Sequence, residues 1–135
     1  MYNNILVPII LDGEHDTDAS FAAARALGSA DAAFTVLHVL EAIPSYAQAE
    51  IPGDVLSNSR QEFAHALSEA AKNLPGAKAK LISGHSGRSI LDYAEANDID
   101  CIVIASHQPG LEDYFLGSTA SRVVRHAKCA VHVIR

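Results

Sequence analysis

The chain has 135 residues, a formal net charge of -6 at neutral pH and a sequence pI of about 5.5. Such an acidic chain has no broad basic surface to neutralise phosphates or anionic lipids, so we expect no nucleic-acid binding. Apolar residues make up 49% of the chain and charged residues 19%, a composition that predicts one globular domain over residues 1–135. The first residues contain neither a signal-like basic and apolar segment nor a bilayer-length apolar stretch, which predicts a cytoplasmic protein without membrane insertion.

Apolar runs of strand length alternate with helical periodicity in the first half of the chain. Residues 4–10 are a predicted interior strand, and Pro8 should end its pairing because proline cannot donate to a sheet ladder. His38 is expected to be a hydrogen-bonded core residue rather than a ligand. His65 and Glu69, one helical turn apart, are interpreted as part of a solvated face rather than as metal ligands. The other elements expected here are a helix at 17–28, a strand at 34–40, an irregular connection at 41–54 and a helix at 55–74.

The second half continues the alternation. In a predicted strand at 77–83, Lys78 and Lys80 alternate with apolar residues, which is typical of a sheet edge with one wet face. Five strands alternating with four helices predict an α/β fold, a parallel sheet with helices on both faces. Ligands of such sheets bind at the carboxyl ends of the strands, where the strand order reverses. The remaining expected elements are a turn at Gly84, a helix at 89–96, a strand at 101–105, a loop at 106–116, a helix from Gly117 and Ser118, and a strand at 130–134.

The segment that begins at Cys101 has the form of a strand, a glycine-containing loop and a helix N-terminus. The first amides of a helix have no intrahelical partners and lie at the positive end of its dipole, so they can bind a phosphate. Gly117 would let an anion approach the main chain, and Ser118 and Thr119 would add hydroxyl donors. The alternative interpretation is structural, with Gly117 as a turn residue and Ser118 as an N-cap.

Several motifs of nucleotide-binding and catalytic folds are absent from the sequence. There is no Gly-Lys-Ser or Gly-Lys-Thr, which excludes the P-loop, and no Gly-x-Gly-x-x-Gly follows the first strand, which argues against a dinucleotide fold. The stretch from Gly84 to Gly87 lacks the spacing of a nucleophile elbow, so hydrolase chemistry is not expected. Cys101 and Cys129 have no short metal-type spacing and are expected to be reduced core side chains.

Four stretches of the chain carry a resemblance to a known family. They are Ile-Leu-Val-Pro from Ile5, Leu-His-Val from Leu37, Ile-Val-Ile-Ala-Ser-His-x-Pro from Ile102 and Leu-Gly-Ser-x-Ala-x-x-Val-Val-Arg-His-Ala-x-Cys from Leu116. Together they resemble the universal stress protein family, in its small single-domain bacterial form, along the whole chain. The resemblance implies an adenine nucleotide alpha hydrolase-like sheet in the order 3-2-1-4-5 and homodimers formed largely through the fifth strand, here Ala130 to Ile134. In many members it also implies binding of ATP or AMP.

The resemblance further implies which residues would hold the nucleotide. Pro8 and Val39, at the ends of the first two strands, match the family pattern, as do Gly117 and Ser118 at the last helix, with Thr119 next in the same turn.

At other positions the chain departs from that pattern. Ala105 and Gln108 replace two glycines of the phosphate loop, and the eight residues between Gln108 and Gly117 make this loop one residue shorter than in the family. Ser106 and His107 are candidates to compensate with side-chain donors. Ile10 stands where the family usually has an aspartate, so Asp12 is the candidate for contacts to the ribose hydroxyls.

These observations predict a stress-response regulatory module that binds ATP or AMP in the crevice between the first and fourth strands, as a homodimer. No cofactor is expected to be required, although Mg²⁺ could accompany ATP, and slow incidental ATP hydrolysis is compatible with a protein that is not an enzyme. The alternative is a dimeric interaction protein of the same fold that works without nucleotide. A third hypothesis is an enzyme of the adenine-nucleotide hydrolase type. The sequence does not identify a protein partner.

Overall fold

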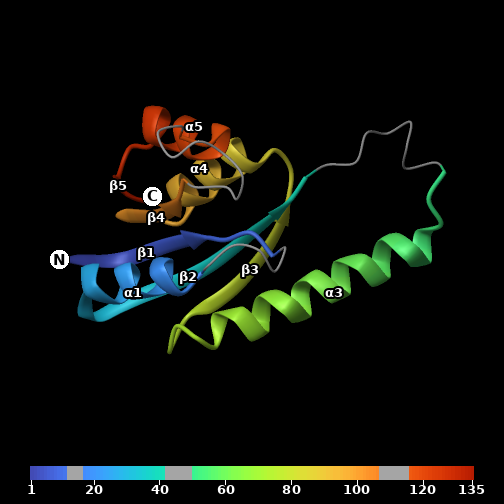
Figure 1. Cartoon of the computed structure of the whole chain (residues 1–135), viewed down its shortest axis with the longest axis horizontal. Coiled ribbons are helices and arrows are strands. Elements are labelled where there is room, and N and C mark those ends of the chain that lie inside the picture. Colours follow the sequence, from blue (N-terminus) through green and yellow to red (C-terminus); the bar gives the residue numbers. More distant parts are fainter. Residues whose placement is uncertain (12–16, 42–49, 107–115) are drawn as a thin grey trace.

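A computed structural model describes residues 1–11, 17–41, 50–106 and 116–135 of the chain. Its five strands form one parallel sheet in the order β3-β2-β1-β4-β5. This confirms the predicted α/β class and strand order (Figure 1). The elements in chain order are β1 (Tyr2–Pro8), α1 (Asp18–Leu27), β2 (Gly28–Leu40), α3 (Gly53–Ala71), β3 (Lys78–Ser83), α4 (Ser86–Ala96), β4 (Cys101–Ala105), α5 (Ser118–His126) and β5 (Ala130–Ile134).

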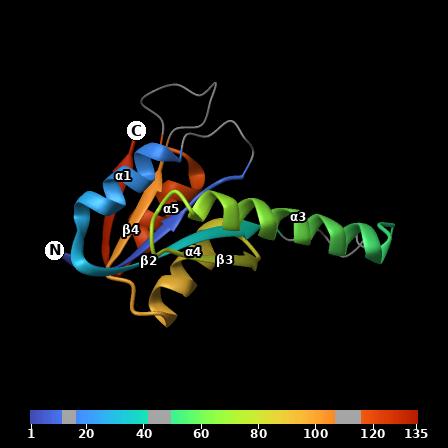
Figure 2. The same cartoon turned by 90° about the horizontal axis from the view of Figure 1, so that it is seen from below.

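Helices cover both faces of the sheet, as predicted (Figures 1 and 2). Successive side chains of a strand point to opposite faces, so the buried strands contribute to two separate cores. Ile5 and Val7 of β1 pack with Phe21 of α1 and Leu67 of α3, whereas Leu6 packs on the other face with residues of α4 and α5. Within the described residues, no helix has both the length and the apolar character needed to cross a bilayer.

Two element starts differ by three residues or more from the sequence-based prediction. Strand β2 begins at Gly28, six residues earlier than predicted, because Tyr2 pairs with Gly28 before an irregularity shifts the register between Tyr2 and Asn4. Helix α4 begins at Ser86, three residues earlier than predicted, since the His85 ring accepts a hydrogen bond from the Arg88 amide at 3.4 Å. Both starts depend on contacts that a local apolar pattern does not contain.

Other predictions can be followed in the structure. Strand β1 ends at Pro8, and β3 lies at a sheet edge, although Ala79 is exposed like the lysines beside it. His65 and Glu69 both lie on an exposed face of α3, and Glu69 accepts a hydrogen bond from Lys72 that lowers the pKa of its carboxyl group.

Both cysteines are free, and they lie in different cores. Cys101 is buried in the core shared with α1 and α3, whereas Cys129 is half-buried against the core under α4 and α5. Burial raises the pKa of the Cys101 thiol to about 11 and also raises the pKa of Cys129. A thiol that stays protonated in an apolar environment is a packing side chain and a poor nucleophile, which agrees with the prediction.

Candidate functional site

The sheet opens between β1 and β4 toward the carboxyl ends of these strands. Among the described residues, β1 and β4 are in register at Ile5–Cys101 and Leu6–Ile102, whereas β1 continues to pair with β2 as far as Pro8–Leu37. The central strands therefore part at the position where the strand order reverses. This is the place at which doubly wound sheets bind ligands.

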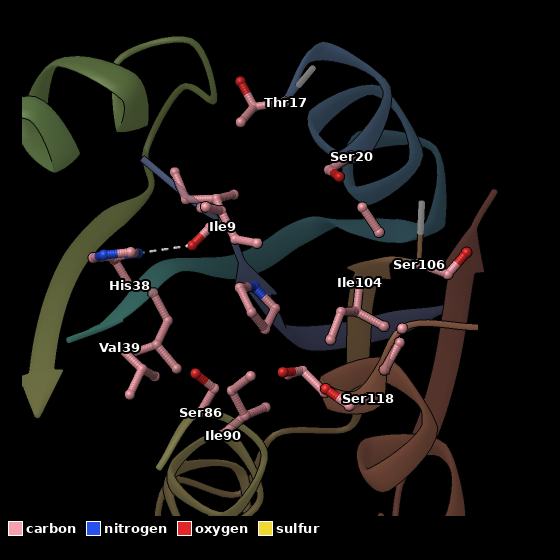
Figure 3. A pocket seen from close by; sticks show the side chains of 17 residues that line it. Ile9, Thr17, Ser20, His38, Val39, Ser86, Ile90, Ile104, Ser106 and Ser118 are labelled. Atoms are coloured by element: carbon pink, nitrogen blue, oxygen red, sulfur yellow. Dashed lines mark hydrogen bonds between the residues drawn. The ribbon is translucent and has the colours of Figure 1, made fainter. Parts of the chain in front are cut away.

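A pocket with a cavity volume of about 150 Å³ lies at this opening (Figure 3). We call it the β1–β4 pocket. Its walls combine aliphatic side chains with hydroxyl groups, and no Asp, Glu, Lys or Arg is among the described residues that line it. Its lining residues are Pro8, Ile9, Ile10, Thr17, Ser20, Leu37, His38, Val39, Ser86, Ile90, Ile104, Ala105, Ser106, Gly117, Ser118, Thr119 and Ala120.

The first turn of α5 opens into this pocket. Gly117 is the N-cap, and its carbonyl accepts the first intrahelical hydrogen bond, from Ser121, at 2.8 Å. The amides of Ser118, Thr119 and Ala120 therefore have no partner within the helix. Because the pocket lining offers no described cationic side chain, these amides and the helix dipole are the positive feature of the described lining.

Ser106 fixes the chain where it leaves β4. Its amide and its hydroxyl both donate to the Ile134 carbonyl, at 2.8 and 3.1 Å, and its own carbonyl accepts from the Gly117 amide at 3.3 Å. Figure 3 accordingly shows the Ser106 oxygen turned away from the pocket. A Cβ atom on Gly117 would lie 3.3 Å from the same Ser106 carbonyl oxygen, so glycine permits this close approach. The hydroxyl of Ser106 is thus already used within the protein.

His38 forms part of the opposite wall. Its Nδ1 atom lies 2.9 Å from the Ile9 carbonyl oxygen, which accepts the hydrogen bond, and its ring stacks on Phe63 with 5.5 Å between centroids. The hydrogen bond confirms the predicted hydrogen bonding of His38, but the residue is half-buried and lines the pocket rather than lying in the core. Two contacts hold the ring in place beside Val39.

The residues predicted from the sequence to bind the nucleotide all line this pocket, apart from those that lie outside the described residues. Pro8, Val39, Ala105, Ser106, Gly117, Ser118 and Thr119 all line it, from four different elements and their ends. Asp12, His107 and Gln108 lie outside the described residues. Ile10 lines the pocket with 52% of its surface exposed.

Sequence reasoning missed several lining residues, among them Thr17, Ser20 and Ser86. The sequence does contain one indication for Ser20, because it is a polar residue on the apolar face of an alanine-rich helix. Ser86 lies at the start of α4, where its amide and hydroxyl both donate to the Glu41 carboxylate. That contact joins residues far apart in the chain and leaves no local pattern.

The described residues offer no ready-made metal centre. No group of three or more His, Cys, Asp or Glu side chains that could hold a metal ion occurs in these parts of the chain. A second cavity, of about 170 Å³, lies near the C-terminal ends of α4 and α5, with Glu95, His126, Lys128 and Cys129 among its lining residues. It shares no lining residue with the β1–β4 pocket.

Comparisons with known proteins agree with this fold. A model of the universal stress protein family matches residues 1–135. A Staphylococcus aureus protein named as a universal stress protein is 32% identical over 146 residues, which cover 99% of this chain and 84% of that protein. The structure of UspA from Lactobacillus plantarum has a TM-score of 0.73 and 29% identity, with 99% of this chain and 98% of that chain covered. A hypothetical protein solved as a structural-genomics test case has a TM-score of 0.81 at 22% identity, with 99% and 96% of the chains covered.

Proposed function

Because this chain belongs to the universal stress protein family, we propose that it is a stress-response regulatory module that binds ATP or AMP in the β1–β4 pocket. One observation carries the proposal: the first amides of α5 open into a pocket formed where β1 and β4 part. A phosphate at those amides completes hydrogen bonds that the helix leaves open. The aliphatic side chains of Val39 and Ile90 form an apolar wall on which the base of a nucleotide can lie.

Solved structures of similar proteins support a nucleotide as the ligand. A universal stress protein in complex with cAMP has a TM-score of 0.72 at 17% identity. A family protein from Arabidopsis thaliana has AMP bound, with a TM-score of 0.63 at 16% identity, and one from Archaeoglobus fulgidus is in complex with dAMP, with a TM-score of 0.62 at 20% identity. All three ligands are adenine nucleotides with a single phosphate.

The proposed role is binding without dedicated catalysis. The sequence contains no nucleophile elbow and no P-loop, and the polar groups of the described lining are hydroxyls, backbone amides and one imidazole. Any Mg²⁺ would then arrive with the triphosphate, since the described residues supply no cluster of ligands for it. Hydrolysis of ATP, where it occurs, is expected to be slow and incidental.

The proposed assembly is a homodimer through β5. The two sheet edges differ in character: β3 carries Lys78 and Lys80, whereas β5 has the sequence Ala-Val-His-Val-Ile without a formal charge. Charged side chains on an edge strand oppose its pairing with another chain, and an uncharged apolar edge strand pairs more readily. This asymmetry favours β5 as the strand that meets a second copy.

One observation favours a second function, that of a dimeric interaction protein that works without nucleotide. Ile10 is 52% exposed at the pocket, where it offers no acceptor for a sugar hydroxyl. An exposed aliphatic side chain of this kind suits contact with another protein better than contact with a polar ligand.

Thermal melting with ATP, ADP and AMP separates the two functions. A ligand that binds the folded state alone should stabilise it by about 2.7 kcal/mol at a concentration of 100 Kd. Gly117→Val should remove this shift, because the added side chain displaces the Ser106 carbonyl and disturbs the start of α5. Gly53→Val is the matched control, since a Cβ atom at Gly53 meets nothing within 4 Å.

The outcomes are distinct. A melting shift that Gly117→Val loses and Gly53→Val keeps supports nucleotide binding at α5. The absence of any shift at millimolar nucleotide contradicts the proposal and favours the interaction protein. A shift that survives in a folded Gly117→Val variant means that nucleotide binds elsewhere.

A further inference from the structure

Ser20 is an unusual residue in the β1–β4 pocket. It lies on the buried face of α1 between Phe21 and the helix start, and it is 2% exposed. No hydrogen bond of its hydroxyl to another described residue is found, yet no fully buried side-chain nitrogen or oxygen among the described residues lacks a partner. The small exposed part of Ser20 is therefore its hydroxyl, and Ser20 lines the pocket.

A hydroxyl in this position needs a partner from the contents of the pocket. Buried polar groups in proteins are almost always hydrogen-bonded, because a missing hydrogen bond leaves the desolvation of the group uncompensated. The neighbouring buried side chains of α1, Phe21 and Ala24, are apolar. An alanine at residue 20 would suit both the helix and this core, so a serine here points to a polar ligand group.

The place of Ser20 in the fold indicates which ligand group this is. In the binding mode proposed above, the phosphate lies at α5 and the base lies against Val39 and Ile90, both on the sheet face covered by α4 and α5. Ser20 reaches the pocket from α1, which covers the opposite face. Figure 3 shows it across the pocket from Ser86 and Ser118. The sugar joins the phosphate to the base, so in this binding mode it is the part of the nucleotide that faces α1 and Ser20.

We propose that Ser20 is a specificity-determining residue whose hydroxyl hydrogen-bonds a ribose hydroxyl of the nucleotide. The proposal rests on the proposed function, since it assigns a contact within the same site. A serine hydroxyl can both donate and accept, as a sugar hydroxyl can, so the pair needs no charge. This contact would make the pocket selective for ribonucleotides although Ile10 contributes no acceptor.

Calorimetric titration with AMP, 2′-deoxy-AMP and 3′-deoxy-AMP tests this contact in the full chain and in the Ser20→Ala variant. The native chain should bind AMP about fivefold more tightly than at least one deoxy analogue, the effect of one net hydrogen bond. Ser20→Ala should weaken the binding of AMP by about the same factor and leave the affinity for that deoxy analogue unchanged. Ser29→Ala is the control, because the Ser29 hydroxyl bonds Asn3 at the other end of β1 and should not affect any of the three ligands.

The possible results separate this inference from the proposed function. Equal binding of AMP and both deoxy analogues by the native chain overturns the role of Ser20 while nucleotide binding stands. A Ser20→Ala variant whose affinity falls by the same factor for all three ligands also overturns the role of Ser20, because the substitution then acts through packing and not through a ribose contact. If the native chain binds none of the three at millimolar concentration, the proposed function fails and the Ser20 contact fails with it.

Discussion

At the scale of single residues, Asp100 holds together the base of the opening that forms the pocket. Its carboxylate accepts hydrogen bonds from the amides of Asn3 and Asn4, at 2.8 and 3.0 Å, and its own amide donates to the Asn4 carbonyl at 2.9 Å. These bonds tie the start of β4 to β1 at the end of the sheet opposite the pocket. The two strands are thus fastened at this end and part at their carboxyl ends.

Asp100→Ala should therefore destabilise the fold by about 1–3 kcal/mol, the range for losing acceptors of charge-assisted hydrogen bonds that leave backbone amides unpaired. Urea unfolding followed by circular dichroism measures this loss. Asp100→Asn is the matched control, since its amide oxygen still accepts from one of the two amides, and it should lose less. An Asp100→Ala variant as stable as the native chain would show that the carboxylate does not fasten β1 to β4.

Residue roles were predictable where a local motif carries them. Gly117 and Ser118 follow from their place before a helical pattern, and the structure places them at the N-terminus of α5. The hydroxyl of Ser106 was a candidate ligand donor from sequence, but its bond to Ile134 depends on the adjacent strand β5. The role of Ser20 was equally hidden, because the pocket that it lines is built by elements from the whole chain.

At the scale of elements, the C-terminal third was predicted most closely. Strand β4, the start of α5 and strand β5 have the predicted bounds. Strand β4 is a buried, continuous apolar run, a glycine marks the start of α5, and β5 is a short run that is apolar apart from His132. The early part of β2 was missed since Ser29 and Asp31 interrupt any apolar pattern. Its strand conformation comes from pairing with Tyr2 and from the hydrogen bond of Ser29 to Asn3.

Strand β5 carries the prediction for dimer formation. The amide and carbonyl of one strand residue point the same way, and the Ile134 carbonyl accepts from Ser106, so the Val133 amide points to the open edge. Val133→Pro should raise the dimer dissociation constant at least tenfold in analytical ultracentrifugation while the monomer stays folded. His132→Pro, whose amide points toward β4, should instead lower the melting temperature. A native chain that sediments as a monomer, or a Val133→Pro variant that stays dimeric, contradicts a β5 interface.

At the scale of the whole molecule, the pocket lies where the two layers of helices meet across the ends of the strands. The lining residue Ser20 comes from the layer of α1 and α3, and Ser86 and Ser118 come from the layer of α4 and α5. The pocket is therefore in contact with both layers of helices. The crevice was predictable from the strand order that the family resemblance implied, whereas the hydroxyl character of its walls required the assembled fold.

The central claim, that a nucleotide phosphate binds the first amides of α5, is tested most directly by two-dimensional ¹⁵N–¹H NMR during titration with AMP. We expect the largest chemical-shift changes at the amides of Ser118, Thr119 and Ala120, with smaller changes at Val39 across the pocket. Unchanged amides at the start of α5 at saturating AMP, or changes confined to the second cavity around His126 and Cys129, would contradict it.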